Sequence, residues 1–312
     1  MKTVVTITLA SLGLCCGYPL AAEAPKPTLA NVAYGPHESQ KLDFYQAKSG
    51  QPTPLVFFIH GGGWLNGDKA GFNNAGQYLP AGISVVSINY RLLPQAEADK
   101  VVPPVKGPLH DAARALQFVR TKAAEWNIDK ERIGASGSSA GACSALWLAF
   151  HPDMADPQSD DPVARESTRL WCAAVTRAQT SLDPRQMIEW TPNNTYGPHA
   201  FGFRGDVAKK LTPFDEFLAK RDTITPWIAE YSPYALVSAD DPPVYLFYDT
   251  PPAFGKPEKN PVHSANFGVG LAEKLKSLGI EHELVYPGAT DVKHADVRQY
   301  LIEKLKEPSL RK

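Results

Sequence analysis

Short apolar segments rich in Val, Ile, Phe or Tyr recur along the chain and are bounded by polar, Gly- or Pro-containing stretches. Their length and composition are typical of parallel strands that are buried on both faces. The predicted strands are Pro54–Ile59, Ile83–Ile88, Arg132–Ala135, Trp171–Thr176, Val244–Tyr248 and His282–Tyr286, with an edge strand at Lys41–Tyr45.

Stretches with helical periodicity lie between these strands. The predicted helices are Leu109–Trp126, Ala140–Phe150, Ala265–Leu278 and Ala295–Leu305, of which Ala140–Phe150 is apolar on nearly every side. Strands that alternate with helices predict an α/β fold, a doubly wound and mostly parallel sheet with helices on both faces.

The segment 180–241 interrupts this alternation. It runs for about sixty residues without a strong strand pattern, which is long for a simple connection. We therefore expect a cap, inserted between the sixth and seventh core strands, over the carboxyl edge of the sheet.

The N-terminus has the pattern of a secretory signal peptide. Lys2 precedes an uncharged apolar run, Thr3–Leu20, and small residues follow it. We predict cleavage after Ala22, a secreted or periplasmic protein with no stable membrane insertion, and one domain over residues 23–312. The two remaining cysteines, Cys143 and Cys172, either pair in such a compartment or remain buried thiols.

Composition narrows the function classes. The 312 residues are 43% hydrophobic, which is enough for the chain to form a packed core. The formal net charge of −1 shows that basic residues are not in excess. Nucleic acid is a poor partner for such a chain, since binding it requires basic residues that neutralise phosphates. No Cys, His and Asp cluster has metal-ligand spacing, and no GxGxxG or P-loop pattern occurs. We expect neither metal nor cofactor.

The strongest chemical motif is the segment Gly137–Gly141, which reads GSSAG between a predicted strand and a predicted helix. This is the context of a nucleophile elbow, where a serine sits on a tight turn between flanking glycines. Ser139 is therefore the candidate nucleophile.

A second motif follows the first long predicted strand. Residues His60–Trp64 read HGGGW, and their glycines can turn backbone N–H groups toward one point. Acyl transfer needs such donors for its oxyanion. We assign the N–H groups of Gly62, Gly63 and Ala140 to an oxyanion hole, and a structural role to His60.

Together the two motifs resemble the α/β-hydrolase superfamily, and more narrowly the HGGGW group of secreted acetylxylan- and feruloyl-type carbohydrate esterases with carboxylesterase and lipase relatives. The resemblance covers the chain from about Lys41 to its end. It implies a catalytic serine, acid and histidine in that chain order, with the histidine after the last strand.

On that order His294 is the predicted base, although the turn around it lacks the Gly-His-Gly-like form of the family; His199 and His263 are the alternatives. The acid is harder to place. We choose Asp249, at the end of a predicted strand, and keep Asp183, Glu258 and the uncharged Asn260 as alternatives.

The expected function is that of a serine esterase that cleaves carboxylic esters through an acyl-enzyme. Its substrate would be a small-molecule or polysaccharide ester, with acetyl and feruloyl esters implied by the resemblance. Two alternatives stay open. One is a catalytically impaired binding protein, which the missing acid favours, and the other is a prolyl-oligopeptidase-like peptidase.

Overall fold

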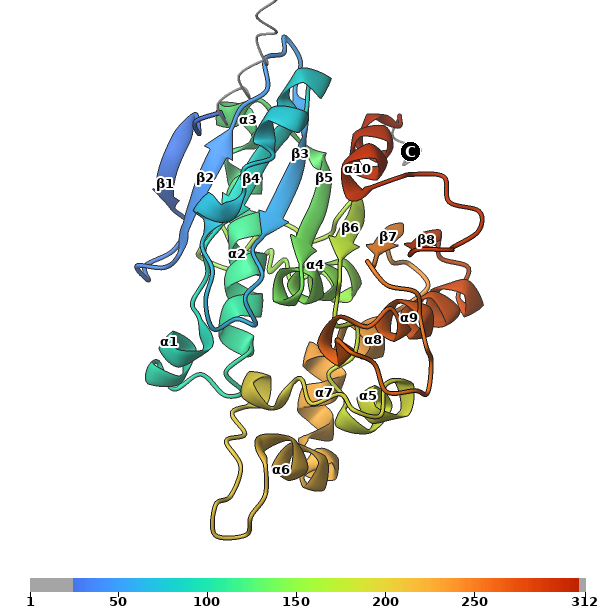
Figure 1. Cartoon of the computed structure of the whole chain (residues 1–312). Coiled ribbons are helices and arrows are strands. Elements are labelled where there is room, and N and C mark those ends of the chain that lie inside the picture. Colours follow the sequence, from blue (N-terminus) through green and yellow to red (C-terminus); the bar gives the residue numbers. More distant parts are fainter. Residues whose placement is uncertain (1–24, 309–312) are drawn as a thin grey trace, which may run out of the picture.

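The computed structural model describes residues 25–308, so the predicted signal peptide, residues 1–22, lies outside the described part of the chain. Its centre is one eight-stranded sheet with the order β1-β2-β4-β3-β5-β6-β7-β8 (Figure 1). The strands are β1 (Leu29–Ala33), β2 (Lys41–Tyr45), β3 (Thr53–Ile59), β4 (Ser84–Ile88), β5 (Ile128–Ser138), β6 (Cys172–Thr176), β7 (Val244–Phe247) and β8 (His282–Val285).

The predicted α/β class and mostly parallel sheet are confirmed. From β4 to β8 all neighbouring strands pair in parallel, whereas β2 pairs antiparallel with both β1 and β4. Strand β1 was missed because its side chains are mostly exposed and show no apolar alternation. Strand β5 also begins earlier than predicted, at Ile128, because a polar, partly exposed stretch precedes its apolar half.

The helices are α1 (Leu93–Ala98), α2 (Lys106–Thr121), α3 (Ala123–Trp126), α4 (Ala140–Phe150), α5 (Pro184–Trp190), α6 (Pro213–Ala219), α7 (Thr225–Tyr231), α8 (Pro233–Leu236), α9 (Asn266–Ser277) and α10 (Val297–Lys306). Short 3-10 turns are η1 (Lys69–Gly71), η2 (Ala75–Gln77), η3 (Leu79–Ala81), η4 (Pro198–Phe201), η5 (Arg221–Ile224) and η6 (Pro261–His263). The predicted helix 109–126 is two helices, because Lys122, with φ −91° and ψ 0°, leaves the helical conformation between them; Asn127, in a left-handed conformation, ends the second one.

Two apolar cores lie on opposite faces of the sheet. The larger contains α2, α4 and α9, and the fully buried Trp147 belongs to it. The smaller is closed by α10, whose Tyr300, Leu301 and Leu305 pack on β6 and its neighbours. Burial of both sheet faces explains why the strands read as continuous apolar runs.

The segment between β6 and β7 holds α5 to α8 with two 3-10 turns, and no strand of the sheet occurs in this described stretch. Figure 1 shows these helices beyond the carboxyl ends of β3, β5 and β6.

Both described cysteines, Cys143 and Cys172, are buried free thiols. Of the two alternatives, the structure therefore has the unpaired one. Among the helices of residues 25–308, none combines the length and apolarity that a membrane span requires.

The crossing of α4 behind β3 provides a test of the fold. A Cβ added at Gly141 would lie 2.1 Å from the carbonyl oxygen of Ile59, whereas one at Gly71 would meet nothing within 4 Å. We expect Gly141→Ala to lower the free energy of unfolding by about 1–3 kcal/mol or more, as overpacking does. The matched control Gly71→Ala should stay within about 0.5 kcal/mol of wild type. Urea denaturation measures both, and equal stabilities would contradict this account.

Candidate active site

Ser139 lies on the tight turn between β5 and α4. Its backbone has φ 54° and ψ −124°, and its N–H donates to the carbonyl of Thr176 at 3.1 Å. The flanking glycines are needed because a Cβ at Gly137 would lie 2.5 Å from the backbone of Gly141. The strained turn predicted for the nucleophile is therefore present.

The HGGGW loop runs directly beside this turn. A Cβ at Gly61 would lie 2.6 Å from the carbonyl oxygen of Ser138, while Gly62 and Gly63 have positive φ. Within the described chain, the N–H groups of Gly62, Gly63 and Ala140 donate no hydrogen bond. These donors remain available to a ligand.

The outer residues of the HGGGW motif hold the loop in place. Tyr90 stacks on the ring of His60 at 4.3 Å and donates to its carbonyl at 2.7 Å. Trp64 is fully buried and donates to the Ser144 hydroxyl at 2.9 Å. The predicted structural role of His60 is confirmed.

The histidine beside the serine is His263. Its Nε2 lies 3.0 Å from Ser139 Oγ, and its Nδ1 lies 3.2 Å from Asn260 Nδ2. Side chains from the segment between β6 and β7 support this loop. Gln179 donates to the carbonyl of Val262 at 2.6 Å, and Asn194 donates to that of Pro261 at 2.8 Å.

The assignment of His294 as the base is corrected by this geometry. His294 Nδ1 bonds Glu283 at 2.7 Å, and its Nε2 faces Glu303 at 3.4 Å. Glu283, on β8, also accepts the backbone N–H groups of Lys293 and His294. The chain after β8 is therefore folded back onto that strand, and its histidine hydrogen-bonds there instead of at Ser139.

The choice of Asp249 as the acid is corrected as well. Asp249 forms an ion pair with Arg177 and no hydrogen bond to either histidine.

The carboxylate alternatives also have other partners. Asp183 caps α5 and binds Arg221 at 2.6 Å. Glu258 accepts a hydrogen bond from the Ser264 hydroxyl at 2.8 Å. The group behind His263 is the alternative Asn260, an amide.

The amide sets a condition on the proton positions. To accept the proton of Ser139, His263 must have a free lone pair on Nε2 and a proton on Nδ1. That proton needs an acceptor, which Asn260 supplies when its Oδ1 faces the ring. The structure has Nδ2 toward the ring, which fits the opposite tautomer with the proton on Nε2, and rotating the amide by 180° gives the tautomer that can accept the Ser139 proton.

Charges around His263 favour its neutral form. Burial, and secondly the Arg177 guanidinium, hold the pKa of His263 below its ordinary range, while Asp249 opposes them. Burial lowers the pKa of His199, the other alternative to His294, to about 4. A neutral imidazole beside a serine hydroxyl is the arrangement of a nucleophile with its general base.

His263 was named only as an alternative because the expected chain order pointed beyond the last strand. The signal that favoured it was its position between the end of β7 and the start of α9. Carboxyl ends of neighbouring parallel strands meet at one edge of the sheet, where Ser139 also lies. Among residues 25–308, no group of His, Cys, Asp and Glu has the arrangement of a metal site.

Parts of the chain are similar in sequence to other proteins. A probable isoprenylcysteine alpha-carbonyl methylesterase of Arabidopsis thaliana is 32% identical over 142 residues, which are 45% of this chain and 28% of that protein. Gut esterase 1 of Caenorhabditis elegans is 28% identical over 162 residues, 50% of this chain and 29% of that protein. The chain thus matches less than a third of the length of either relative.

Solved structures are similar over more of the chain. An acetyl ester-xyloside bifunctional hydrolase from Caldicellulosiruptor lactoaceticus superposes with a TM-score of 0.58 at 25% identity, covering 79% of this chain and 76% of that one. A truncated carbohydrate esterase from gut microbiota gives 0.66 at 20% identity, covering 92% and 99%, and this match supports the α/β-hydrolase fold.

The family model described as BD-FAE matches residues 42–251, a range that includes both the HGGGW loop and the serine turn. This range is more than half of the chain. The protein therefore belongs to the BD-FAE family.

Proposed function

We propose that this protein is a serine esterase that hydrolyses acetyl or feruloyl esters of carbohydrates through an acyl-enzyme. The observation that carries the proposal is the 3.0 Å contact between Ser139 Oγ and His263 Nε2 at the end of β5. Membership of the BD-FAE family and the likeness to carbohydrate esterases support the ester class.

In the proposed reaction, His263 accepts the Ser139 proton as Oγ attacks the ester carbonyl carbon. The free N–H groups of Gly62, Gly63 and Ala140 stabilise the resulting oxyanion. The imidazolium then protonates the departing alcohol oxygen, which leaves an acyl group on Ser139. A water molecule, deprotonated by His263, attacks the acyl carbon; the bond from that carbon to Ser139 Oγ breaks, the imidazolium returns the proton to Oγ, and the acid leaves.

Asn260 orients the imidazole in this scheme without giving it a counter-charge. This requires the amide to be rotated from the orientation in which Nδ2 faces Nδ1, so that its oxygen accepts from Nδ1–H and Nε2 is free to receive a proton. Amides serve this purpose in Cys-His-Asn hydrolases.

The segment 180–241 acts as the cap in this proposal. Asn194 from this segment supports the His263 loop, as described above. His199 approaches the other side of the site, because a Cβ built on Gly63 would lie 3.8 Å from His199 Nε2. One inserted segment therefore contacts both the loop that carries His263 and the oxyanion loop.

The proposal includes the cellular location and the domain organisation expected from the sequence. The N-terminal pattern supports removal of residues 1–22 and a secreted or periplasmic protein with one domain over 23–312. Mass determination of the N-terminus of the exported protein tests the cleavage site.

A binding protein without activity is the second candidate. The observation that favours it is the amide of Asn260 at the place of the acid, since an amide does not stabilise an imidazolium by charge. The intact serine turn and the free N–H donors favour the esterase, because a binding protein needs neither.

A fluorophosphonate probe separates the two candidates, because it labels only activated serines. We expect labelling of the wild type and none of Ser139→Ala. His263→Ala should lower kcat/KM for 4-nitrophenyl acetate by about 10⁴-fold or more, as losing the base does in serine hydrolases. His294→Gln is the matched control and should retain near wild-type turnover. Absence of labelling in the folded wild type would favour the binding protein.

Replacing the orienting amide gives the next prediction. Asn260→Ala removes a single hydrogen bond to His263, so we expect kcat to fall about three- to tenfold. Asn260→Asp adds a negative charge that favours the imidazolium and should raise the pKa of His263. The acid limb of the kcat/KM profile should then move to higher pH. Wild-type profiles for both variants would show that Asn260 does not orient the base.

Removing either member of the Arg177–Asp249 ion pair should shift the pKa of His263, in opposite directions. Only neutral His263 is active, so activity falls as the pH drops through its pKa, which lies below the ordinary value of about 6.5. Arg177→Gln removes a cation and should raise this pKa, whereas Asp249→Asn removes an anion and should lower it. Because both side chains are about half exposed, each shift should stay under about one pH unit. NMR titration of the His263 ring in each variant measures it, and shifts in the same direction would contradict the assignment.

A further inference from the structure

A cavity of about 580 Å³ opens beside the serine turn, on the face of the sheet that α10 covers. The proposed reaction leaves it without a role. Its floor consists of the last residues of β3, β5, β6 and β7, at the sheet edge where ligands of α/β proteins bind. The chain after β8 folds back to Glu283 and then borders this space with Asp296, Val297 and Arg298 at the start of α10.

Strand register arranges this floor in a row. Ser138 on β5 pairs with Thr176 on β6, which pairs with Phe247 on β7. Two residues earlier on β5, Ser136 pairs with Phe58 on β3. Since alternate residues of a strand point to one face, Ser136 and Ser138 project into the same space. The cavity is therefore floored by hydroxyls that lie between two phenylalanine rings.

The hydroxyls of this floor have no partner in the described chain. Ser136, Ser138 and Thr176 form no side-chain hydrogen bond with any residue of the range 25–308. A hydroxyl both donates and accepts, so this row can bond a ligand that also carries hydroxyls.

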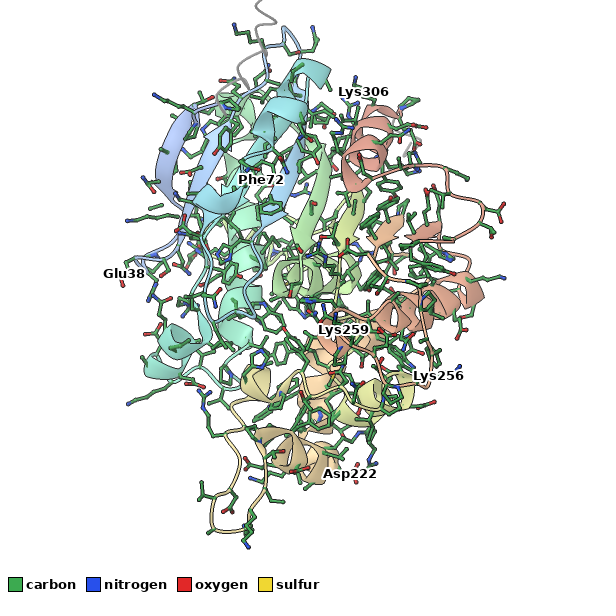
Figure 2. All side chains as sticks on the ribbon, in the orientation of Figure 1. Glu38, Phe72, Asp222, Lys256, Lys259 and Lys306 are labelled. Carbon is green, nitrogen blue, oxygen red and sulfur yellow. The ribbon has the colours of Figure 1, made fainter. Side chains whose placement is uncertain are left out.

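Aromatic and amide groups form the opposite wall. Phe72 lies over the middle strands (Figure 2), with its ring centroid 4.4 Å from that of Phe58. Asn74 and Gln77 add exposed amides at the rim. Arg298 faces Asp296 at 3.4 Å, so the two charges at the far end cancel.

These features select a class of ligand. Free hydroxyls, planar amides and aromatic faces suit a ring with polar edges and C–H faces, and the cancelled charges suit a neutral one. We propose that this cavity binds a pyranose ring of the neutral oligosaccharide that carries the ester. This inference rests on the proposed function, whose substrate it specifies.

The cavity adjoins the turn that carries the nucleophile. Ser138 directly precedes Ser139, and Thr176, whose side chain lines the cavity, accepts the Ser139 N–H at 3.1 Å. A sugar ring on this floor would hold an esterified oxygen beside the reacting centre. Binding energy from the ring would then position the ester for attack.

Binding without turnover tests the proposal independently of catalysis. The probe is xylotriose, titrated into Ser139→Ala protein and followed by calorimetry. We expect Thr176→Val and Asn74→Ala, each added to Ser139→Ala, to raise Kd about three- to tenfold, the effect of one hydrogen bond. The control is Thr290→Val, which removes the same hydroxyl from an exposed residue outside the cavity. It should leave Kd unchanged.

The outcomes separate this inference from the proposed function. Xylotriose binding that weakens only in the two cavity variants supports the subsite, even if no ester is hydrolysed. Absence of binding, or equal weakening in Thr290→Val, overturns the subsite even if 4-nitrophenyl acetate is hydrolysed. If Thr176→Val fails to fold, Asn74→Ala on the exposed rim decides alone.

Discussion

The close passage of α4 behind the ends of β3 and β5 is the constraint on which the site depends. Gly141 leaves so little room that a Cβ would lie 2.6 Å from the His60 carbonyl, so the serine turn and the HGGGW loop must adjoin. Ser139, with its positive φ, and the free N–H groups lie next to that contact. The two buried cores on either side of the sheet hold the strand ends at this separation.

The sheet and its helices could be predicted from the sequence because buried parallel strands and amphipathic helices leave local patterns. The serine and the oxyanion loop could be predicted for a similar reason, since each occupies a short glycine-rich turn. Strand β1 carries too little apolar signal and was missed. Local pattern thus succeeds where a few consecutive residues determine the geometry.

The histidine and its partner could not be found in this way. Which of His263 and His294 meets Ser139 depends on the path of two loops, and one hydrogen-bonded residue, Glu283, determines the second path. Similarly, Asp249 pairs with Arg177 instead of hydrogen-bonding the imidazole. These competing contacts join residues far apart in the chain, so neither spacing nor composition reveals them.

An uncharged partner behind His263 changes where the transition state must be stabilised. A carboxylate would favour the imidazolium directly, whereas Asn260 orients the ring and leaves the charge to Asp249, whose effect is opposed by Arg177. More of the stabilisation then falls to the N–H groups that face the oxyanion and to binding energy from the rest of the substrate. The proposed sugar site, with its unbonded hydroxyls beside the serine turn, would supply such binding energy. Tight binding of the alcohol portion by itself lowers KM, so the proposed sugar site can complement the uncharged amide only by positioning the ester for attack.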